Sequence, residues 1–149
     1  MDQILSEQRF NEQVTLLLSL KQTIQDNGWV VDVVFPDLFC KMHPRNHAEI
    51  IFMPRLRCND YPARSPSLQF VDPEIKKEGI EFWPKQGDAF TAALGRGPPP
   101  QLCIEGIREF HEGCHSSSSD QIQYPWKPEK FTFVNILLRV QNLLDKAYP

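Results

Sequence analysis

Apolar residues recur at three-, four- and seven-residue steps near both ends of the chain, which is the period of amphipathic helices. The first stripe predicts a helix over residues 4–26, ended by Asn27 and Gly28, which tolerate a left-handed cap conformation. The second predicts a helix that begins after Thr132, a good N-cap, and ends near Ala147. The predicted buried faces are Phe10, Val14, Leu17, Leu18 and Ile24 in the first helix, and Phe133, Ile136, Leu137, Val140, Leu143 and Leu144 in the second.

Between these helices the pattern changes to short runs rich in β-branched and aromatic residues, which predict strands. Short connections between such runs favour an antiparallel meander. A short helix is also expected from Asp88, as N-cap, to Leu94. Three apolar residues before it, Ile80, Phe82 and Trp83, are expected to pack against the core. The predicted strands are residues 29–35, 38–43, 48–53 and 67–71.

The order of these elements indicates an α+β fold. It consists of an N-terminal helix, a four-stranded antiparallel meander sheet, a loop that carries a cysteine, and a C-terminal helix. We find no internal repeat and no composition change that marks a domain boundary, so residues 1–149 are expected to form a single domain.

Composition excludes several function classes. A net charge of −3 gives no reason to expect nucleic acid or an anionic membrane as partner. No apolar run is long enough to span a bilayer. The N-terminus lacks a basic region followed by an apolar one, so a cytoplasmic location is expected. In that reducing compartment the four cysteines, Cys40, Cys58, Cys103 and Cys114, are expected to be free thiols.

The chemistry is expected to centre on Cys103. Three consecutive prolines, Pro98 to Pro100, form a stiff extended connector that delivers Cys103 to one fixed place, and Gly106 supplies a turn behind it. Such a loop suits the presentation of a thiolate to a partner. The alternative is that Cys103 is a small buried hydrophobe, as free cysteines commonly are.

Residues 112–120 are small and polar and predict a mobile surface loop, with Cys114 exposed in it. His111 and His115 lie eight and twelve residues after Cys103 and could fold back over its sulfur. The run His111-x-x-Cys114-His115 also contains three residues of the types that bind zinc, and His43 and His47 are four residues apart. The spacings depart from the usual zinc motifs, so no metal site is expected. For Cys40 and Cys58, packing in the core or at a strand edge is the simplest interpretation.

The order of landmarks resembles the ubiquitin-conjugating-enzyme superfamily over nearly the whole chain. Tyr61-Pro62-x-x-x-Pro66 leads into Leu68-x-Phe70, as a Tyr-Pro-x-x-Pro-Pro segment does in that family. Leu102-Cys103-Ile104-Glu105 stands where the family has its catalytic cysteine, and Trp126-Lys127-Pro128 resembles its Trp-Ser-Pro segment. Two features differ. The usual His-Pro-Asn triplet before the cysteine is absent from residues 94–98, and Cys103 and Trp126 are 23 residues apart, which is more than usual.

The resemblance is nearest to divergent bacterial conjugating-enzyme-like proteins of operons linked to antiviral defence, and it implies a function. The protein would be a transferase without a cofactor. Cys103 would accept a ubiquitin-like protein as a thioester from an activating enzyme and pass it to an amine of a protein substrate. The partners would be the activating enzyme, the ubiquitin-like protein and the protein substrate, with no nucleic acid and no membrane.

The resemblance makes Cys103 the catalytic residue, and His111 and His115 are candidate catalytic residues because of their spacing from it. Either histidine could donate a hydrogen bond to the oxyanion in place of the missing asparagine, or deprotonate the incoming amine, and His111 is preferred. A surface position without a catalytic role is the alternative for His111.

Three other functions remain compatible with the sequence. A non-catalytic module of the same fold would only bind a ubiquitin-like protein. A zinc-stabilised interaction domain would use the cysteines and histidines as ligands. A cysteine hydrolase would need a histidine and an orienting acid around the thiol.

Overall fold

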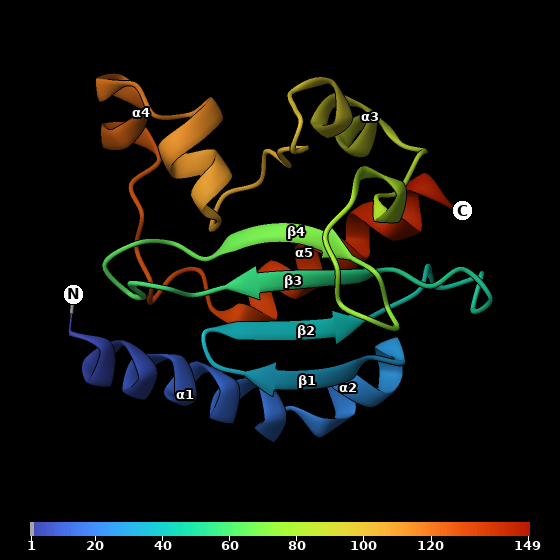
Figure 1. The fold of residues 1–149 in the computed structure, drawn as a ribbon, viewed down its shortest axis with the longest axis horizontal. Coiled ribbons are helices and arrows are strands. Elements are labelled where there is room, and N and C mark those ends of the chain that lie inside the picture. The colour runs from blue at the N-terminus through green and yellow to red at the C-terminus, as the bar shows by residue number, and fades with distance from the viewer. Residues whose placement is uncertain (1) are drawn as a thin grey trace.

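The computed structural model describes residues 2–149. It is an α+β structure in which one antiparallel sheet with the strand order β1-β2-β3-β4 packs against helices, as predicted (Figure 1). Within residues 2–149, no helix combines the length and the apolar character that a membrane crossing requires. The elements are α1 (Gln3–Ser19), α2 (Lys21–Asn27), β1 (Val30–Val34), β2 (Asp37–Lys41), β3 (Met53–Arg57), β4 (Ser67–Val71), η1 (Ile80–Phe82), α3 (Asp88–Gly95), η2 (Phe110–Cys114), α4 (Ser118–Gln123) and α5 (Phe133–Ala147).

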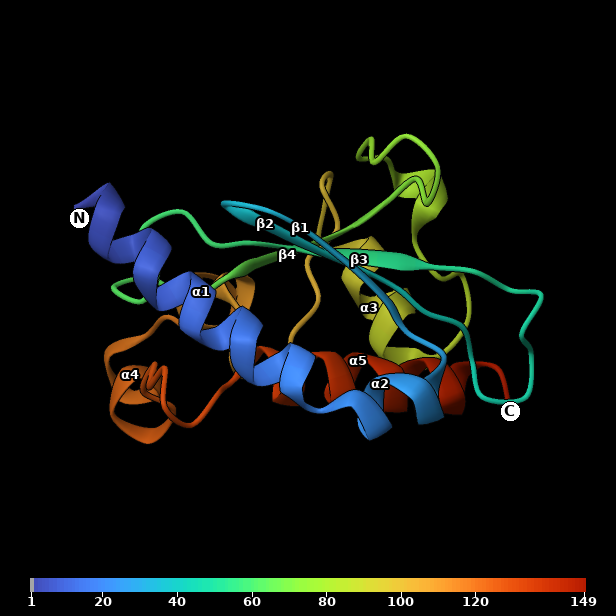
Figure 2. The same cartoon turned by 90° about the horizontal axis from the view of Figure 1, so that it is seen from below.

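The main core lies between the sheet and the helices on one of its faces. Figure 2 shows α1, α2 and α5 on the same side of the sheet, while the segment that directly follows β4 loops over the opposite side before the chain returns to α3. Leu38, Leu56 and Leu68 are paired across β2, β3 and β4 and are fully buried in this core. Each such side chain contributes about 1.5–3 kcal/mol relative to an exposed one.

The predicted helical stripes largely form this core. Phe10 of α1 packs against Phe133 of α5, with ring centroids 5.6 Å apart. Thr132 caps α5 as predicted, because its side chain accepts a hydrogen bond from the Asn135 N–H. Leu18 does not follow the prediction, since its side chain is 45% exposed.

The first helix is interrupted, which corrects the prediction of one helix over residues 4–26. Leu20 has φ −87° and ψ 58°, so the chain leaves helical geometry between α1 and α2. The Ser19 hydroxyl donates to the Leu16 carbonyl (2.6 Å) in this last turn. Such side-chain bonding competes with the helical ladder. Gly28 ends α2 with φ 67°, as expected for a left-handed cap.

The third strand was predicted too early in the chain. Residues 48–52 lie in a turn region with a single bridge, Met42 to Phe52, and the strand is β3, Met53–Arg57. Pro54 lies inside β3 and pairs with Phe70 of β4. On the other side of β3, the pairing with β2 ends at Phe39 and Arg55, so Pro54 has no partner in β2. Proline donates no hydrogen bond, and it is tolerated here because no ladder bond to β2 is needed.

A small second apolar cluster lies outside the main core and consists of Phe39, Met53 and Val71. The segment after β4 covers it, because the Lys76 ammonium lies 4.6 Å from the centre of the Phe39 ring. Burial of the apolar residues near η1 is only partly as predicted. Trp83 is 1% exposed, whereas Ile80 is 51% exposed.

Candidate active site

The connector before Cys103 is held from two sides. The Gln69 side chain of β4 donates from Nε2 to the Pro100 carbonyl (2.9 Å). The Gln101 N–H donates to the Ala93 carbonyl of α3 (3.1 Å), and the Arg96 guanidinium donates to the Gln101 carbonyl (2.9 Å). The triproline segment is therefore fixed both to the sheet and to the end of α3. It is not extended as predicted, because the chain bends at Pro98 and Pro99. The Gly97–Pro98 and Pro98–Pro99 peptide bonds are cis.

Cys103 lies between two anchoring side chains. Leu102 is 1% exposed and Ile104 is 9% exposed, so both are buried in the main core. Cys103 itself is half-buried. The two buried neighbours hold the backbone in place and leave part of the cysteine at the surface. This is intermediate between the open thiol and the buried hydrophobe that the sequence allows.

The turn behind Cys103 requires Gly106. Its φ is +103°, a conformation that L-residues rarely adopt. A β-carbon here would lie 3.0 Å from the β-carbon of Phe131 and 3.2 Å from Cγ1 of Ile136. The Gly106 N–H donates to Nε2 of His111 (3.0 Å).

His111 is buried, and both of its ring nitrogens have backbone partners. Because Nε2 accepts from Gly106, Nδ1 carries the proton and donates to the Tyr124 carbonyl (3.1 Å). Burial lowers the pKa of His111, in keeping with a neutral ring. The catalytic role predicted for His111 stays a prediction, and these contacts favour a positioning role in which the ring ties residue 106 to residue 124.

Cys114 is exposed, as predicted, but it is not a free thiol. It ends the π-helix η2 and forms a disulfide bond with Cys103 across a Cα–Cα distance of 6.6 Å. The expectation of four free thiols is therefore wrong for this pair. Cys40 and Cys58 are free and fully buried, which fits the core interpretation. Burial raises the pKa of both of these thiols.

The loop predicted for residues 112–120 contains two short helical segments, η2 and α4, which corrects the loop prediction. Ser117 begins α4 by accepting a hydrogen bond from the Asp120 N–H (3.1 Å). A run of serines is typical of a loop, but a single serine in the N-cap position is enough to start a turn of helix.

His115 lies beside the two sulfurs. One of its ring nitrogens and the sulfurs of Cys103 and Cys114 all lie within 4.8 Å of one another. The ring stacks on Phe110, with centroids 4.4 Å apart, and its Nδ1 is 3.5 Å from the Asp120 carboxylate. A hydrogen bond from Ser117, which has the larger effect, and one from His115 hold the pKa of Asp120 below its usual range. The structure thus brings together Cys103, Cys114 and His115, and adds Asp120, which sequence reasoning missed.

The zinc alternative changes with this geometry. The sequence suggests His111, Cys114 and His115 as a possible set of zinc ligands. Within residues 2–149, the structure instead brings together Cys103, Cys114 and His115. His43 and His47 lie elsewhere: Nδ1 of His43 is 2.7 Å from the Pro44 carbonyl, and His47 contacts Glu49 and the carbonyl of residue 149. Three donors are one fewer than a closed structural zinc site uses.

A polar network that the sequence did not indicate fastens η2 to the sheet. The Glu109 carboxylate accepts from the Ser67 hydroxyl (2.6 Å) and the Leu68 N–H (2.8 Å). Burial raises its pKa, and the hydrogen bonds from Leu68 and Ser67 oppose that effect. The Arg108 N–H donates to the Pro66 carbonyl (2.7 Å), and its guanidinium donates to the Asn59 carbonyl (2.9 Å). The chain that leads into Cys114 therefore starts from a fixed base.

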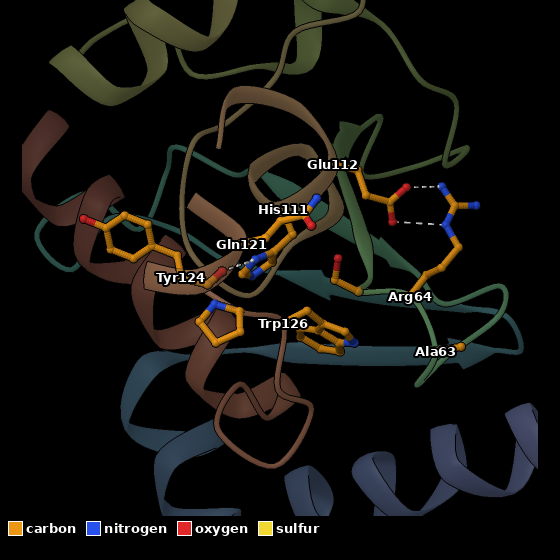
Figure 3. A pocket seen from close by; sticks show the side chains of 9 residues that line it. Ala63, Arg64, His111, Glu112, Gln121, Tyr124 and Trp126 are labelled. Atoms are coloured by element: carbon orange, nitrogen blue, oxygen red, sulfur yellow. Dashed lines mark hydrogen bonds and ion pairs between the residues drawn. The ribbon is translucent and has the colours of Figure 1, made fainter. Parts of the chain in front are cut away.

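A pocket of about 320 Å³ borders His111 (Figure 3). Its rim carries a two-point ion pair in which Arg64 donates to Glu112 at 3.1 and 2.6 Å. Neither Cys103 nor Cys114 lines it. The residues around it are Ala63, Arg64, Ser65, His111, Glu112, Gln121, Tyr124, Pro125 and Trp126.

Comparison of the chain with protein-family models and with curated proteins found no match.

Proposed function

We propose that this protein is a carrier enzyme of a ubiquitin-like conjugation system, with Cys103 as the acceptor. The observation that carries the proposal is the setting of Cys103. It is half-buried after a triproline connector that is tied to β4 and α3, and it lies between two fully or nearly buried side chains. Three further features that support it are the antiparallel meander, the flanking helices and the resemblance of the sequence landmarks.

The proposed reaction has two acyl transfers. The Cys103 thiolate attacks the thioester carbonyl on the activating enzyme, a new C–S bond forms, and the thiolate of the activating enzyme leaves. A substrate amine then attacks the same carbonyl, an amide forms, the bond to Cys103 breaks, and the amine's proton passes to a base. Since the disulfide occupies the acceptor sulfur, the reaction starts from the reduced protein.

His115 is the histidine better placed to assist in this reaction. His111 uses both ring nitrogens for backbone contacts, whereas His115 lies within 4.8 Å of the sulfurs with a partly exposed ring. In the proposed mechanism His115 accepts the proton of the incoming amine, and His111 keeps the loop in position. The partners are the activating enzyme, the ubiquitin-like protein and a protein substrate. A setting in bacterial antiviral defence rests on the resemblance alone.

The test is formation of a thioester by the reduced full-length protein with an activating enzyme, ATP and a ubiquitin-like protein. We expect an adduct that thiol reductants remove, that is absent from Cys103→Ala and that is retained by Cys114→Ala. An adduct lost only from Cys114→Ala would move the acceptor to the other cysteine. Non-covalent binding of the ubiquitin-like protein without any reductant-sensitive adduct would favour the binding module.

A second candidate is a cysteine hydrolase, because His115 with Asp120 beside the sulfurs resembles the base and orienting acid that such an enzyme needs. The two candidates differ in the nucleophile that discharges the thioester. A hydrolase releases the acyl group to water as rapidly without an added amine as with it, whereas a carrier discharges faster as the amine concentration rises.

A further inference from the structure

We infer that Cys103 and Cys114 form a reversible dithiol–disulfide pair, so that Cys103 is a site of oxidation by hydroperoxides and Cys114 is its resolving thiol. The consequence for activity, loss and recovery of the acceptor thiol, rests on the proposed function. The existence of the redox pair does not rest on the proposed function, because it depends only on the positions of the two sulfurs.

The backbone is already arranged for this bond. The Cα–Cα distance of 6.6 Å lies within the range of disulfides, so the sulfurs meet without any movement of the loop. Cys103 is half-buried on its fixed connector, whereas Cys114 is exposed at the end of η2. A soluble reductant therefore reaches the bond from the Cys114 side.

The two ends of the bond differ in how firmly they are held. The buried side chains of Leu102 and Ile104 fix Cys103. Cys114 follows the exposed Gly113, and a β-carbon at Gly113 would meet no atom closer than 3.6 Å. Opening of the disulfide therefore requires movement only of the exposed end, and the Cys103 loop keeps its place.

The oxidation is balanced with a hydroperoxide as the two-electron oxidant. The Cys103 thiolate attacks the terminal peroxide oxygen, the O–O bond breaks, and Cys103 becomes a sulfenic acid, while the hydroxide or alkoxide that leaves takes a proton from solvent to give water or an alcohol. The Cys114 thiolate then attacks the Cys103 sulfur, the S–O bond breaks, and hydroxide leaves as water after it takes a proton. A dithiol reductant reverses the change by thiol–disulfide exchange and becomes a disulfide itself.

This arrangement both blocks and protects the acceptor. In the disulfide, Cys103 has no thiolate to receive an acyl group. Without a resolving thiol, a sulfenic acid can be oxidised further to a sulfinic acid, which simple thiols do not reverse. Cys114 is near enough to trap the sulfenic acid before that step.

The chain offers internal references for the experiment. Cys40 and Cys58 are fully buried, so they do not react with alkylating agents in the folded protein. The matched control is the double variant Cys114→Ser with Ser118→Cys. It keeps the number of thiols and the polar character of the segment, but moves the thiol from η2 into the exposed first turn of α4.

The experiment follows native alkylation and intact mass. Full-length protein is reduced, treated with a zinc chelator, and exposed to hydrogen peroxide. We expect the wild type to lose two alkylation sites and two hydrogen atoms, and to regain both on treatment with a dithiol. We expect Cys114→Ser and the matched control to trap a sulfenic acid that dimedone labels, and then to pass to a sulfinic acid that the dithiol does not repair.

Three results would overturn the inference. The wild type could keep both sites open to alkylation after peroxide treatment. Cys114→Ser could recover as completely as the wild type. Before chelation, the reduced protein could hold one zinc ion that shields both sulfurs, which would make the pair a metal site and not a redox pair.

The thioester assay then separates this inference from the proposed function. If wild-type protein forms the disulfide reversibly but the reduced form accepts no ubiquitin-like protein, the proposed function fails and the redox pair stands. If the peroxide-treated wild type forms the thioester as fully as the reduced protein, the redox pair fails and the carrier function stands.

Discussion

Replacement of His111 by alanine tests the positioning role most sharply. The change removes the acceptor of the Gly106 N–H and the donor to the Tyr124 carbonyl. Gly106 is buried, so its N–H is left without a partner at a cost of about 1–3 kcal/mol, and the second bond contributes about 1 kcal/mol. We expect a total loss of about 3 kcal/mol in the free energy of unfolding. For a domain of this size that loss lowers Tm by roughly 6–12 °C.

The pH dependence gives a second, independent readout. Burial lowers the pKa of folded His111, so the unfolded state, with a pKa of about 6.5, binds the proton more readily. The stabilisation is therefore complete above about pH 6.5 and is lost as the pH falls through the lower folded pKa. Wild-type protein should lose stability on acidification in this window, and His111→Ala should lack this part of the slope.

The assay is thermal unfolding followed by circular dichroism between pH 5 and 8, under reducing conditions so that the disulfide does not contribute. The matched control is His115→Ala, because the His115 ring is partly exposed and contacts the side chains of Asp120 and Phe110. We expect this control to unfold closer to the wild type than His111→Ala does. A His111→Ala protein that unfolds within about 1 °C of the wild type, a shift far below that expected for such a loss, would refute the reasoning.

Three further outcomes are expected. Gly106→Ala should lower the free energy of unfolding by about 2–4 kcal/mol, because φ is +103° and the new methyl meets a side chain at 3.0 Å. In the same denaturant titration Gly113→Ala should raise it by about 0.4–1 kcal/mol, because Gly113 is in η2 and the nearest atom to a new β-carbon lies at 3.6 Å. Leu56→Ala should cost about 2–5 kcal/mol by chemical denaturation, and a smaller cost would mean that this site is not in a packed core. Reduction of the Cys103–Cys114 bond, which spans a separation of 11 residues, should lower stability by about 3 kcal/mol, and an unchanged unfolding midpoint would contradict this expectation.

The helical regions of α1, α2, α3 and α5 and three of the strands could be predicted because their signals are local, whereas α4 lies in a segment predicted as a loop. Periodic apolar residues and the Thr132 cap identify α5, and β4 has the predicted bounds. The third strand could not be placed in the same way. A proline usually marks the end of a strand, and only the pairing shows that Pro54, which pairs with Phe70 of β4 and with no residue of β2, is tolerated inside one.

In the candidate site, too, the residues with a local sequence signal could be predicted and those that depend on tertiary contacts could not. Cys103 could be singled out because prolines and a glycine flank it in the sequence. Its partner could not, since Cys114 reaches it only through the path of η2, which Glu109 and Arg108 set by binding groups of residues 59–68. The role of His111 likewise depends on a carbonyl 13 residues away, which no local pattern reveals.

The most direct measurement is the fate of Cys103 in a single-turnover thioester assay with reduced, full-length protein. We expect a reductant-sensitive adduct with the ubiquitin-like protein, mapped by mass spectrometry to Cys103 and discharged faster as the amine concentration rises. An adduct that forms equally well on Cys103→Ala would contradict Cys103 as the acceptor. No adduct with the cognate activating enzyme present and both cysteines reduced would contradict the carrier function.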